Sequence, residues 1–160
     1  MNSKDIFITN SSKQTQKMGE ILAKELKKGE IICLSGELGS GKTTFAQGVL
    51  KGLGAKKPYT SPTFVVMKEY KIRTSLQGSI FPLSAAASNF SRSNLFIYHI
   101  DAYRVGAKDI LDLGWEEIIA DKNNVVIVEW AERIKNIIPR DAIWLGFEHM
   151  KEDERKISIK

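Results

Sequence analysis

Apolar positions along the chain follow two different spacings, one typical of buried strands and one typical of amphipathic helices. Short, mostly apolar runs predict strands over residues 30–35, 64–70, 95–101 and 125–130. Apolar residues three and four apart, bounded by caps, glycine or proline, predict helices over residues 11–28, 43–54, 109–113 and 131–138. Strands interleaved with helices in this way indicate an α/β fold with a largely parallel central sheet.

Both ends of the chain are expected to add strands to this sheet. Residues 5–9 predict a short strand with Ile6 and Ile8 on one face. Residues 142–147 and 156–159 predict antiparallel edge strands, joined by a charged turn over residues 149–153. The first helix is expected to bury one apolar stripe, formed by Met18, Ile21, Leu22 and Leu26.

Residues 72–94 interrupt the pattern. The stretch is rich in Ser and Ala, contains Gly78 and Pro82, and has no clear periodicity. A connection of this length without its own structure is either a functional lid or a mobile excursion. The mobile excursion is the preferred interpretation, because nothing in the stretch resembles a binding constellation. We therefore expect one domain over residues 1–160, with an insertion at about 72–94.

The composition indicates an ordinary globular domain without a membrane span. The chain is 42% hydrophobic and 27% charged, as in an ordinary globular domain, and no segment approaches the about 18 apolar residues of a membrane span. The N-terminus lacks the pattern of a signal peptide, and the single cysteine, Cys33, lies in a predicted strand, so a reducing, cytoplasmic setting is expected. The net charge of +5 is spread over several segments, which is typical of solvated surface. We expect neither a membrane nor DNA as a partner.

One motif between a predicted strand and a predicted helix carries the strongest functional signal. Residues 36–43 match G-x-x-x-x-G-K-[ST], a loop whose glycines let backbone N–H groups point inward at a phosphate chain. Lys42 is expected to reach the β- and γ-phosphates, and the Thr43 hydroxyl to bind Mg²⁺. Thr44 is a candidate for the α-phosphate or an ordinary helix residue. The expected nucleotide-binding residues are Gly36, Glu37, Leu38, Gly39, Ser40, Gly41, Lys42, Thr43 and Thr44.

Two predicted strands end in a carboxylate, at Asp101 and at Glu129. Because ligands bind at the carboxyl ends of parallel strands, both side chains are expected near the phosphate loop. One would lie at the metal and one would orient the attacking water, and the sequence leaves open which does which. His99 shares a strand face with Asp101, where a purely structural role is the alternative.

Two neighbouring residues extend this cluster. Arg104 could neutralise phosphate charge or pair with Asp101. Thr63 follows Pro62 and is similar to the threonine of nucleotide-sensing switch loops; the alternative is an ordinary turn residue.

Four motifs in this order resemble the TsaE (YjeE) family, small bacterial P-loop ATPases required for making threonylcarbamoyladenosine (t6A) in tRNA. The motifs are Gly36 to Phe45, Ser61-Pro62-Thr63-Phe64, His99-Ile100-Asp101-Ala102-Tyr103-Arg104 and Val128-Glu129-Trp130. The resemblance covers nearly the whole chain. It implies a three-layer P-loop NTPase fold and bound ATP and Mg²⁺. The family usually joins the strands around Tyr70 and Leu95 by a short connection, so residues 72–94 are a departure.

The resemblance also implies roles for particular residues. Metal binding and catalysis would fall on Thr43, Asp101 and Glu129, together with Lys42. Trp130, Tyr103 and Arg104 would support them, and Thr63 would be the switch-like threonine. Ser12 and Arg133 would lie near the base.

The activity that the resemblance implies is ATP hydrolysis, which would drive a cycle in a larger assembly. The partners would be TsaB- and TsaD-type proteins, the threonylcarbamoyl transfer would belong to TsaD, and tRNA would be contacted through the complex. Hydrolysis by the isolated chain would be slow. Two other hypotheses are a small-molecule kinase, with residues 72–94 including Arg73 and Arg92 as its lid, and a scaffold that binds ATP without useful hydrolysis. A GTPase is disfavoured, because the sequence has no N-K-x-D guanine-recognition motif.

Overall fold

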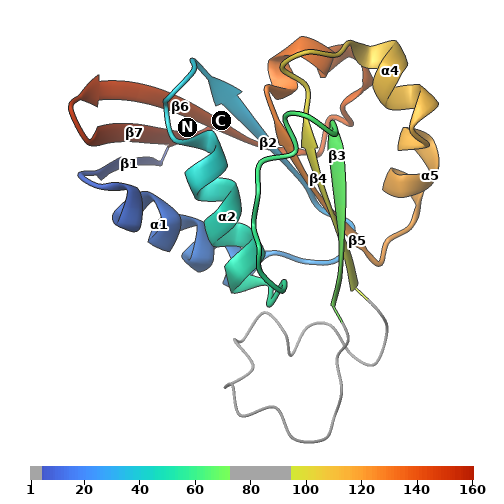
Figure 1. Cartoon of the computed structure of the whole chain (residues 1–160), viewed down its shortest axis with the longest axis horizontal. Helices are drawn as coiled ribbons and strands as arrows, with labels where there is room; N and C mark the ends of the chain where they lie inside the picture. Colours follow the sequence, from blue (N-terminus) through green and yellow to red (C-terminus); the bar gives the residue numbers. More distant parts are fainter. Residues whose placement is uncertain (1–4, 73–94) are drawn as a thin grey trace, which may run out of the picture.

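The protein, described by a computed structural model over residues 5–72 and 95–160, is built on a seven-stranded sheet with the strand order β1-β7-β6-β2-β5-β4-β3 (Figure 1). The strands are β1 (Ile6–Thr9), β2 (Ile31–Gly36), β3 (Met67–Ile72), β4 (Leu95–Asp101), β5 (Asn124–Glu129), β6 (Ile143–Lys151) and β7 (Glu154–Ile159). The helices are α1 (Ser12–Glu25), α2 (Lys42–Gly52), α4 (Ala107–Asp112), α5 (Trp115–Ala120) and the 3₁₀-helix η1 (Ala131–Ile137). Residues 72–94 were predicted to be an excursion or a lid, and residues 73–94 lie outside the described residues.

The four central strands, β6, β2, β5 and β4, run parallel to one another. The outer strands β1, β7 and β3 pair antiparallel with their neighbours. This arrangement confirms the predicted α/β fold with a parallel core. The predicted edge position of residues 142–147 is wrong, because β6 lies inside the sheet beside β2 and the edges are β1 and β3. The charged second half of β6 suggested that the strand ends at the sheet's edge. Residues 148–151 are indeed exposed, but this part of β6 still pairs with β7.

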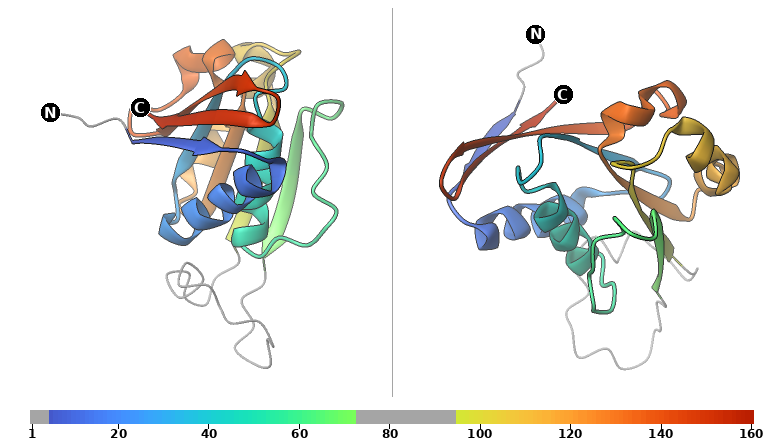
Figure 2. Two further views of the ribbon diagram at one scale, coloured as in Figure 1. Left: turned by 90° about the vertical axis from the view of Figure 1, so that its left-hand side faces the viewer. Right: turned by 45° about the horizontal axis from the view of Figure 1, so that its top comes forward.

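Helices cover both faces of the sheet, so the domain has three layers (Figures 1 and 2). On one face α1 and α2 pack over a core that includes Ile32 and Leu34 of β2. On the other face α4, α5 and η1 pack over a core that includes Ile31 and Cys33. Alternate residues of the buried strand β2 therefore pack into two different cores, one on each face of the sheet. Burial raises the pKa of the Cys33 thiol to about 12, so this thiol stays protonated at neutral pH.

The buried face of α1 is set by small side chains. Gly19 and Ala23 are buried, whereas Ile21 is 46% exposed, so the predicted stripe is wrong at Ile21. A Cβ added to Gly19 would lie 2.3 Å from the carbonyl oxygen of Phe45 in α2. The two helices approach so closely that only small residues fit between them, and apolar periodicity does not report this constraint. The helix also ends at Glu25, earlier than the predicted residue 28.

Gly48 in α2 provides a test of this close packing. Its added Cβ would lie 2.0 Å from the carbonyl oxygen of Gln16 in α1. Alanine favours a helix interior by about 1 kcal/mol over glycine, but overpacking against backbone costs about 1–3 kcal/mol. We expect Gly48→Ala to lower the free energy of unfolding, as measured by urea denaturation. Lys13→Ala on the exposed side of α1 is the control; an unchanged midpoint for Gly48→Ala would contradict the packing.

Three further elements differ from the sequence predictions. β3 begins at Met67, and not at Phe64, because residues 62–65 form a turn closed by the Val65 amide and the Pro62 carbonyl. In this turn Phe64 is 85% exposed, although its apolar run resembled a strand. A helix, α5, starts directly after Gly114, which the sequence suggested was only a helix end. In β1, Ile6 and Ile8 share a face as predicted but are exposed. None of the described helices is long and apolar enough to cross a membrane.

Candidate functional site

The loop between β2 and α2 has the backbone conformation that its glycines predict. Gly36, Gly39 and Gly41 have φ angles of 138°, 76° and 102°, which residues with a Cβ rarely adopt. At Gly36 space is limiting as well, since a Cβ there would lie 2.2 Å from the carbonyl oxygen of Phe147. Gly41 is the N-cap of α2, so the loop leads into the positive end of the helix dipole. This geometry is that of an anion-binding loop.

Lys42 is buried at the centre of this loop. Its Nζ atom donates to the carbonyl oxygens of Gly36 and Glu37, both at 2.7 Å, and lies 3.8 Å from the ring centroid of Trp130. Burial lowers the pKa of Lys42, while the nearby charges of Glu129, Glu132 and Asp101 raise it. The ammonium group is therefore already removed from bulk water and bonded to acceptors of the loop itself.

The two strand-end carboxylates lie side by side next to the loop, as predicted. Asp101 of β4 and Glu129 of β5 are neighbours in the parallel register, and both are buried. The Thr43 hydroxyl donates to Glu129 Oε2 at 2.6 Å. His99 Nε2 lies 2.7 Å from the other carboxylate oxygen, Oε1. Glu129 thus connects the start of α2 to β4, and His99 lies next to the candidate site, where its contact fits either a functional or a structural role.

Asp101 is held by the turn before β3. The Thr63 hydroxyl donates to Asp101 Oδ2 at 2.6 Å, and the Tyr103 amide donates to Oδ1 at 2.8 Å. The Ser61 and Thr63 hydroxyls are also 2.6 Å apart. The structure therefore brings the predicted switch-like threonine to the second carboxylate. Since the half-buried Thr63 is followed directly by the exposed Phe64 and Val65, a segment that reaches the surface is bonded to a buried acid.

The oxygen donors of the site fit a magnesium ion. The Thr43 hydroxyl and the carboxylates of Asp101 and Glu129 are hard oxygen ligands. No cluster of three or more His, Cys, Asp or Glu side chains suited to a metal occurs within residues 5–72 and 95–160. Mg²⁺ matches such a sparse set, because it usually binds one or two carboxylates together with waters and phosphate oxygens.

Several predicted residues lie at the margin of the site. Arg104 is exposed, with its guanidinium carbon 5.1 Å from the Phe64 ring centroid, so the considered pairing with Asp101 is wrong. The Tyr103 ring packs against Trp130 at 4.8 Å between centroids. Ser12 and Arg133 are exposed, at the start of α1 and in η1. The N-cap of α1 is the preceding residue, Ser11.

Two features of the site were not recognised from the sequence. The Oε1 atom of Glu132 lies 3.4 Å from the Gly36 amide nitrogen, and the charge of Glu132 acts to raise the pKa of Lys42. Trp130 adopts a left-handed conformation with φ 59°, which for a large side chain costs on the order of 1 kcal/mol. This turn places its indole over the Lys42 ammonium group. Trp130 was expected beside the site from the family resemblance, but its backbone conformation was not; for Glu132 the only available signal was its position three residues after Glu129.

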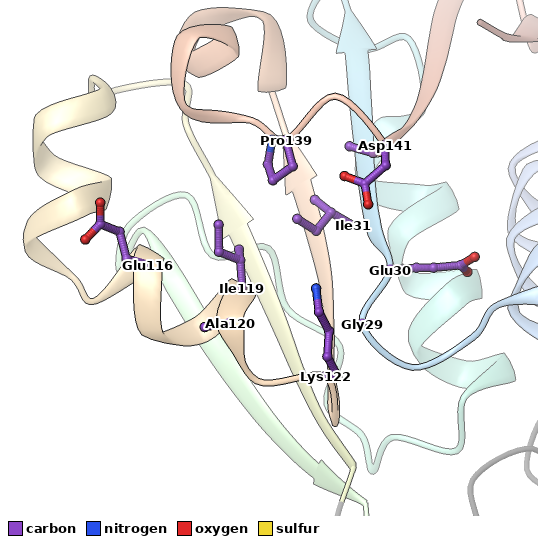
Figure 3. A pocket seen from close by; sticks show the side chains of 10 residues that line it. Gly29, Glu30, Ile31, Glu116, Ile119, Ala120, Lys122, Pro139 and Asp141 are labelled. Atoms are coloured by element: carbon purple, nitrogen blue, oxygen red, sulfur yellow. The ribbon is translucent and has the colours of Figure 1, made fainter.

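A separate hollow of about 320 Å³ lies at the opposite end of the sheet (Figure 3). Its lining includes Gly29 and Ile31 at the start of β2, together with Lys122 and Pro139. Ligands of open parallel sheets bind at the carboxyl ends of the strands. The phosphate loop, at the other end of β2, is therefore the better candidate site.

The domain has three α/β layers, and the glycine-rich loop follows the central parallel strand β2. The two strands beside β2 in the sheet order, β5 and β4, each end in an acid. These features define the class of P-loop nucleotide-binding folds. The family model described as "Threonylcarbamoyl adenosine biosynthesis protein TsaE" matches residues 9–157. The chain belongs to the TsaE family of tRNA t6A biosynthesis, as its motifs predicted.

Individual relatives agree with this assignment. A protein of Rickettsia conorii, described as "tRNA threonylcarbamoyladenosine biosynthesis protein TsaE", is 34% identical over 152 residues, which cover 94% of this chain and 74% of the relative. The protein of the same description from Bacillus subtilis is 31% identical over 151 residues, covering 94% of this chain and 82% of the relative. The crystal structure of YdiB from the same species superposes with a TM-score of 0.73 at 27% identity, covering 99% of this chain and 86% of that one.

Proposed function

We propose that this chain binds ATP with Mg²⁺ and hydrolyses it to drive the t6A modification cycle. The observation that carries the proposal is one connected set of contacts. Lys42 lies inside the phosphate loop, Thr43 is bonded to Glu129, and Asp101 lies beside Glu129 in the register. Phosphate binding, metal binding and water activation each need one of these groups.

Binding of ATP would give the Lys42 ammonium group new hydrogen-bond acceptors in place of its present ones. The amides of residues 36–43 and the N-terminal end of α2 would receive the phosphates. The β- and γ-phosphate oxygens would replace the Gly36 and Glu37 carbonyls as partners of the Lys42 ammonium group. Because Lys42 is already desolvated, little further dehydration opposes this exchange.

The contacts suggest different roles for the two carboxylates. Glu129 is bonded to Thr43, whose hydroxyl is the loop's metal ligand in the proposal, so Glu129 would hold Mg²⁺ with it. When bound, Mg²⁺ would neutralise charge on the phosphates. Asp101 is bonded instead to Thr63 and would orient the attacking water. His99 would keep the Glu129 carboxylate in position.

Transition-state charge requires a further cation. Arg104, the candidate within the chain, packs on Phe64 at the surface and is not directed at the carboxylates. A cation from a partner would complete the site, and the proposed partners are TsaB- and TsaD-type proteins acting on tRNA in the cytoplasm. A missing arginine of this kind slows P-loop hydrolysis by about 10³–10⁵-fold.

This proposal predicts slow ATP hydrolysis by the isolated chain and a large acceleration by its partners. Phosphate release would be measured for the chain alone, with each partner, and with both, at equal ATP and Mg²⁺. Acceleration towards 10³-fold or more is expected for the complete set. A fast rate from the isolated chain that the partners leave unchanged would contradict the proposal. In cells, loss of the chain should remove t6A from tRNA, and its return should restore the modification.

A further inference from the structure

The turn before β3 contains a residue in an unfavourable backbone conformation. Val66 has a φ angle of 65°, and the Met67 amide donates to the Val65 carbonyl at 2.7 Å across it. A hydrogen bond between the neighbours of a residue with positive φ is the pattern of the rare, strained form of the γ-turn. A positive φ is especially unusual for a β-branched side chain. Val66 therefore keeps this turn in a conformation that its own side chain disfavours.

Contacts on both sides of Val66 hold it in this conformation. Its carbonyl accepts from the Asp101 amide at 2.8 Å, and its side chain packs against the core under α4, α5 and η1. Three residues earlier, the Thr63 hydroxyl donates to Asp101 Oδ2. Strained residues persist only where the surrounding structure fixes them, and they gather at active sites and switch segments. Both of these hydrogen bonds end on Asp101, so the strained turn is tied to the candidate site.

The tip of the same turn is weakly held. Phe64 and Val65 expose 85% and 57% of their surfaces, and the Arg104 guanidinium group that packs on the Phe64 ring is itself exposed. Segments with few buried contacts open locally at a low free energy. The turn lies between α2 and β3, at the end of the sheet that carries the phosphate loop (Figure 1). A strained residue and an exposed tip thus occur together in a segment bonded to a site acid.

We propose that residues 62–66 form a two-state switch segment with Val66 as its hinge. The inference rests on the proposed function, in which Asp101 orients the attacking water. In the closed state seen here, Thr63 occupies Asp101 Oδ2. Rotation of Val66 to a negative φ would break its bond to the Asp101 amide and carry Thr63 away, which frees Oδ2 for the water. The strain relieved at Val66 offsets part of the cost of losing these bonds, as a two-state element requires.

Paired alanine and glycine substitutions test the strain at Val66. Glycine tolerates a positive φ and alanine does not, so Val66→Gly should keep the turn closed better than Val66→Ala. The measurement is hydrogen exchange of the Asp101 amide, followed by NMR, because this amide is bonded to the Val66 carbonyl. Its exchange should be about 2- to 10-fold slower in Val66→Gly than in Val66→Ala.

Val65 provides the matched control. It is in the same turn but has no positive φ. The order of the two substitutions should reverse there, since glycine at an ordinary position favours the more disordered, open state. Comparing glycine with alanine at each position removes the effect of losing the valine side chain. Melting temperatures check that all four variants are folded.

The same variants connect the segment to the reaction. With both partners present, kcat for ATP hydrolysis should be about 2- to 10-fold lower in Val66→Gly than in Val66→Ala, because the closed state is favoured. The affinity for Mg-ATP, measured by calorimetry, should be equal in the two variants, since Val66 is bonded to Asp101 and not to the phosphate loop. Val65→Gly should not lower kcat relative to Val65→Ala.

Each other outcome overturns part of the inference in a distinct way. The same order of exchange rates at both positions would show that Val66 is not strained in solution. The expected exchange rates with equal kcat values would show that the segment does not act on the reaction. If the unaltered protein and its partners hydrolysed no ATP, the proposed function would fail, and the exchange comparison, which needs no nucleotide, would still decide whether Val66 is a strained hinge.

Discussion

Replacing Lys42 by alanine is expected to remove tight ATP binding. The ammonium group is buried between loop carbonyls, Ser40 and Trp130, and no other side chain bonded to these loop carbonyls among the described residues carries a positive charge. Truncating one partner of a buried charge pair costs about 2–5 kcal/mol, which corresponds to roughly a 30- to 5,000-fold loss of affinity. Equilibrium binding of ATP, followed by calorimetry, measures the change.

Lys51→Ala is the matched control for this substitution. Lys51 lies on the same helix, is exposed, and bonds to Glu20 away from the loop. Its loss should leave ATP affinity unchanged. If Lys42→Ala kept the affinity of the original protein, the nucleotide would have to bind elsewhere.

Replacing Asp101 by asparagine is expected to separate hydrolysis from binding. Asparagine has nearly the shape of aspartate and can still accept from the Tyr103 amide, but it is a poor base. Positioned acid–base groups contribute about 10²–10⁴-fold to rates, so the turnover measured with both partners should fall by this factor. ATP affinity should change only a few-fold, because Asp101 is not bonded to the loop.

A companion variant distinguishes the two acids. Glu129→Gln alters the partner of Thr43 and should raise the Mg²⁺ concentration needed for half-maximal binding of ATP. The same shift in Asp101→Asn would reverse the assigned roles. In cells, Asp101→Asn should stall t6A formation; full modification by this variant would favour a scaffold that binds ATP without needing to hydrolyse it.

Features encoded by local sequence were predictable. The glycines at 36, 39 and 41 required an unusual backbone, and the structure has it. Asp101 and Glu129 ended apolar runs, and parallel pairing then brought them to one edge. The backbone conformation of the loop is decided by residues within the loop itself. The position of the two acids follows from the general rule that the carboxyl ends of parallel strands meet at one edge of the sheet.

Features that depend on contacts between distant segments were not predictable. The outward direction of Arg104 depends on the turn that exposes Phe64, and the exposure of Ile21 depends on the glycines between α1 and α2. Likewise, the partner of His99 is decided by the β4–β5 register. An apolar pattern reports which residues avoid water on average, but not which neighbour each one meets.

The glycine contacts between α1 and α2 have a mechanical consequence. The backbones of the two helices lie so close at Gly19 and Gly48 that an added Cβ would lie 2.3 and 2.0 Å from a carbonyl oxygen of the facing helix, so the two helices pack as one unit. Any displacement of the loop at the start of α2 would therefore carry α1 and its N-terminal turn as one body. The other wall of the site, where Thr63 is bonded to Asp101, is not part of this helix pair and could be displaced independently of it.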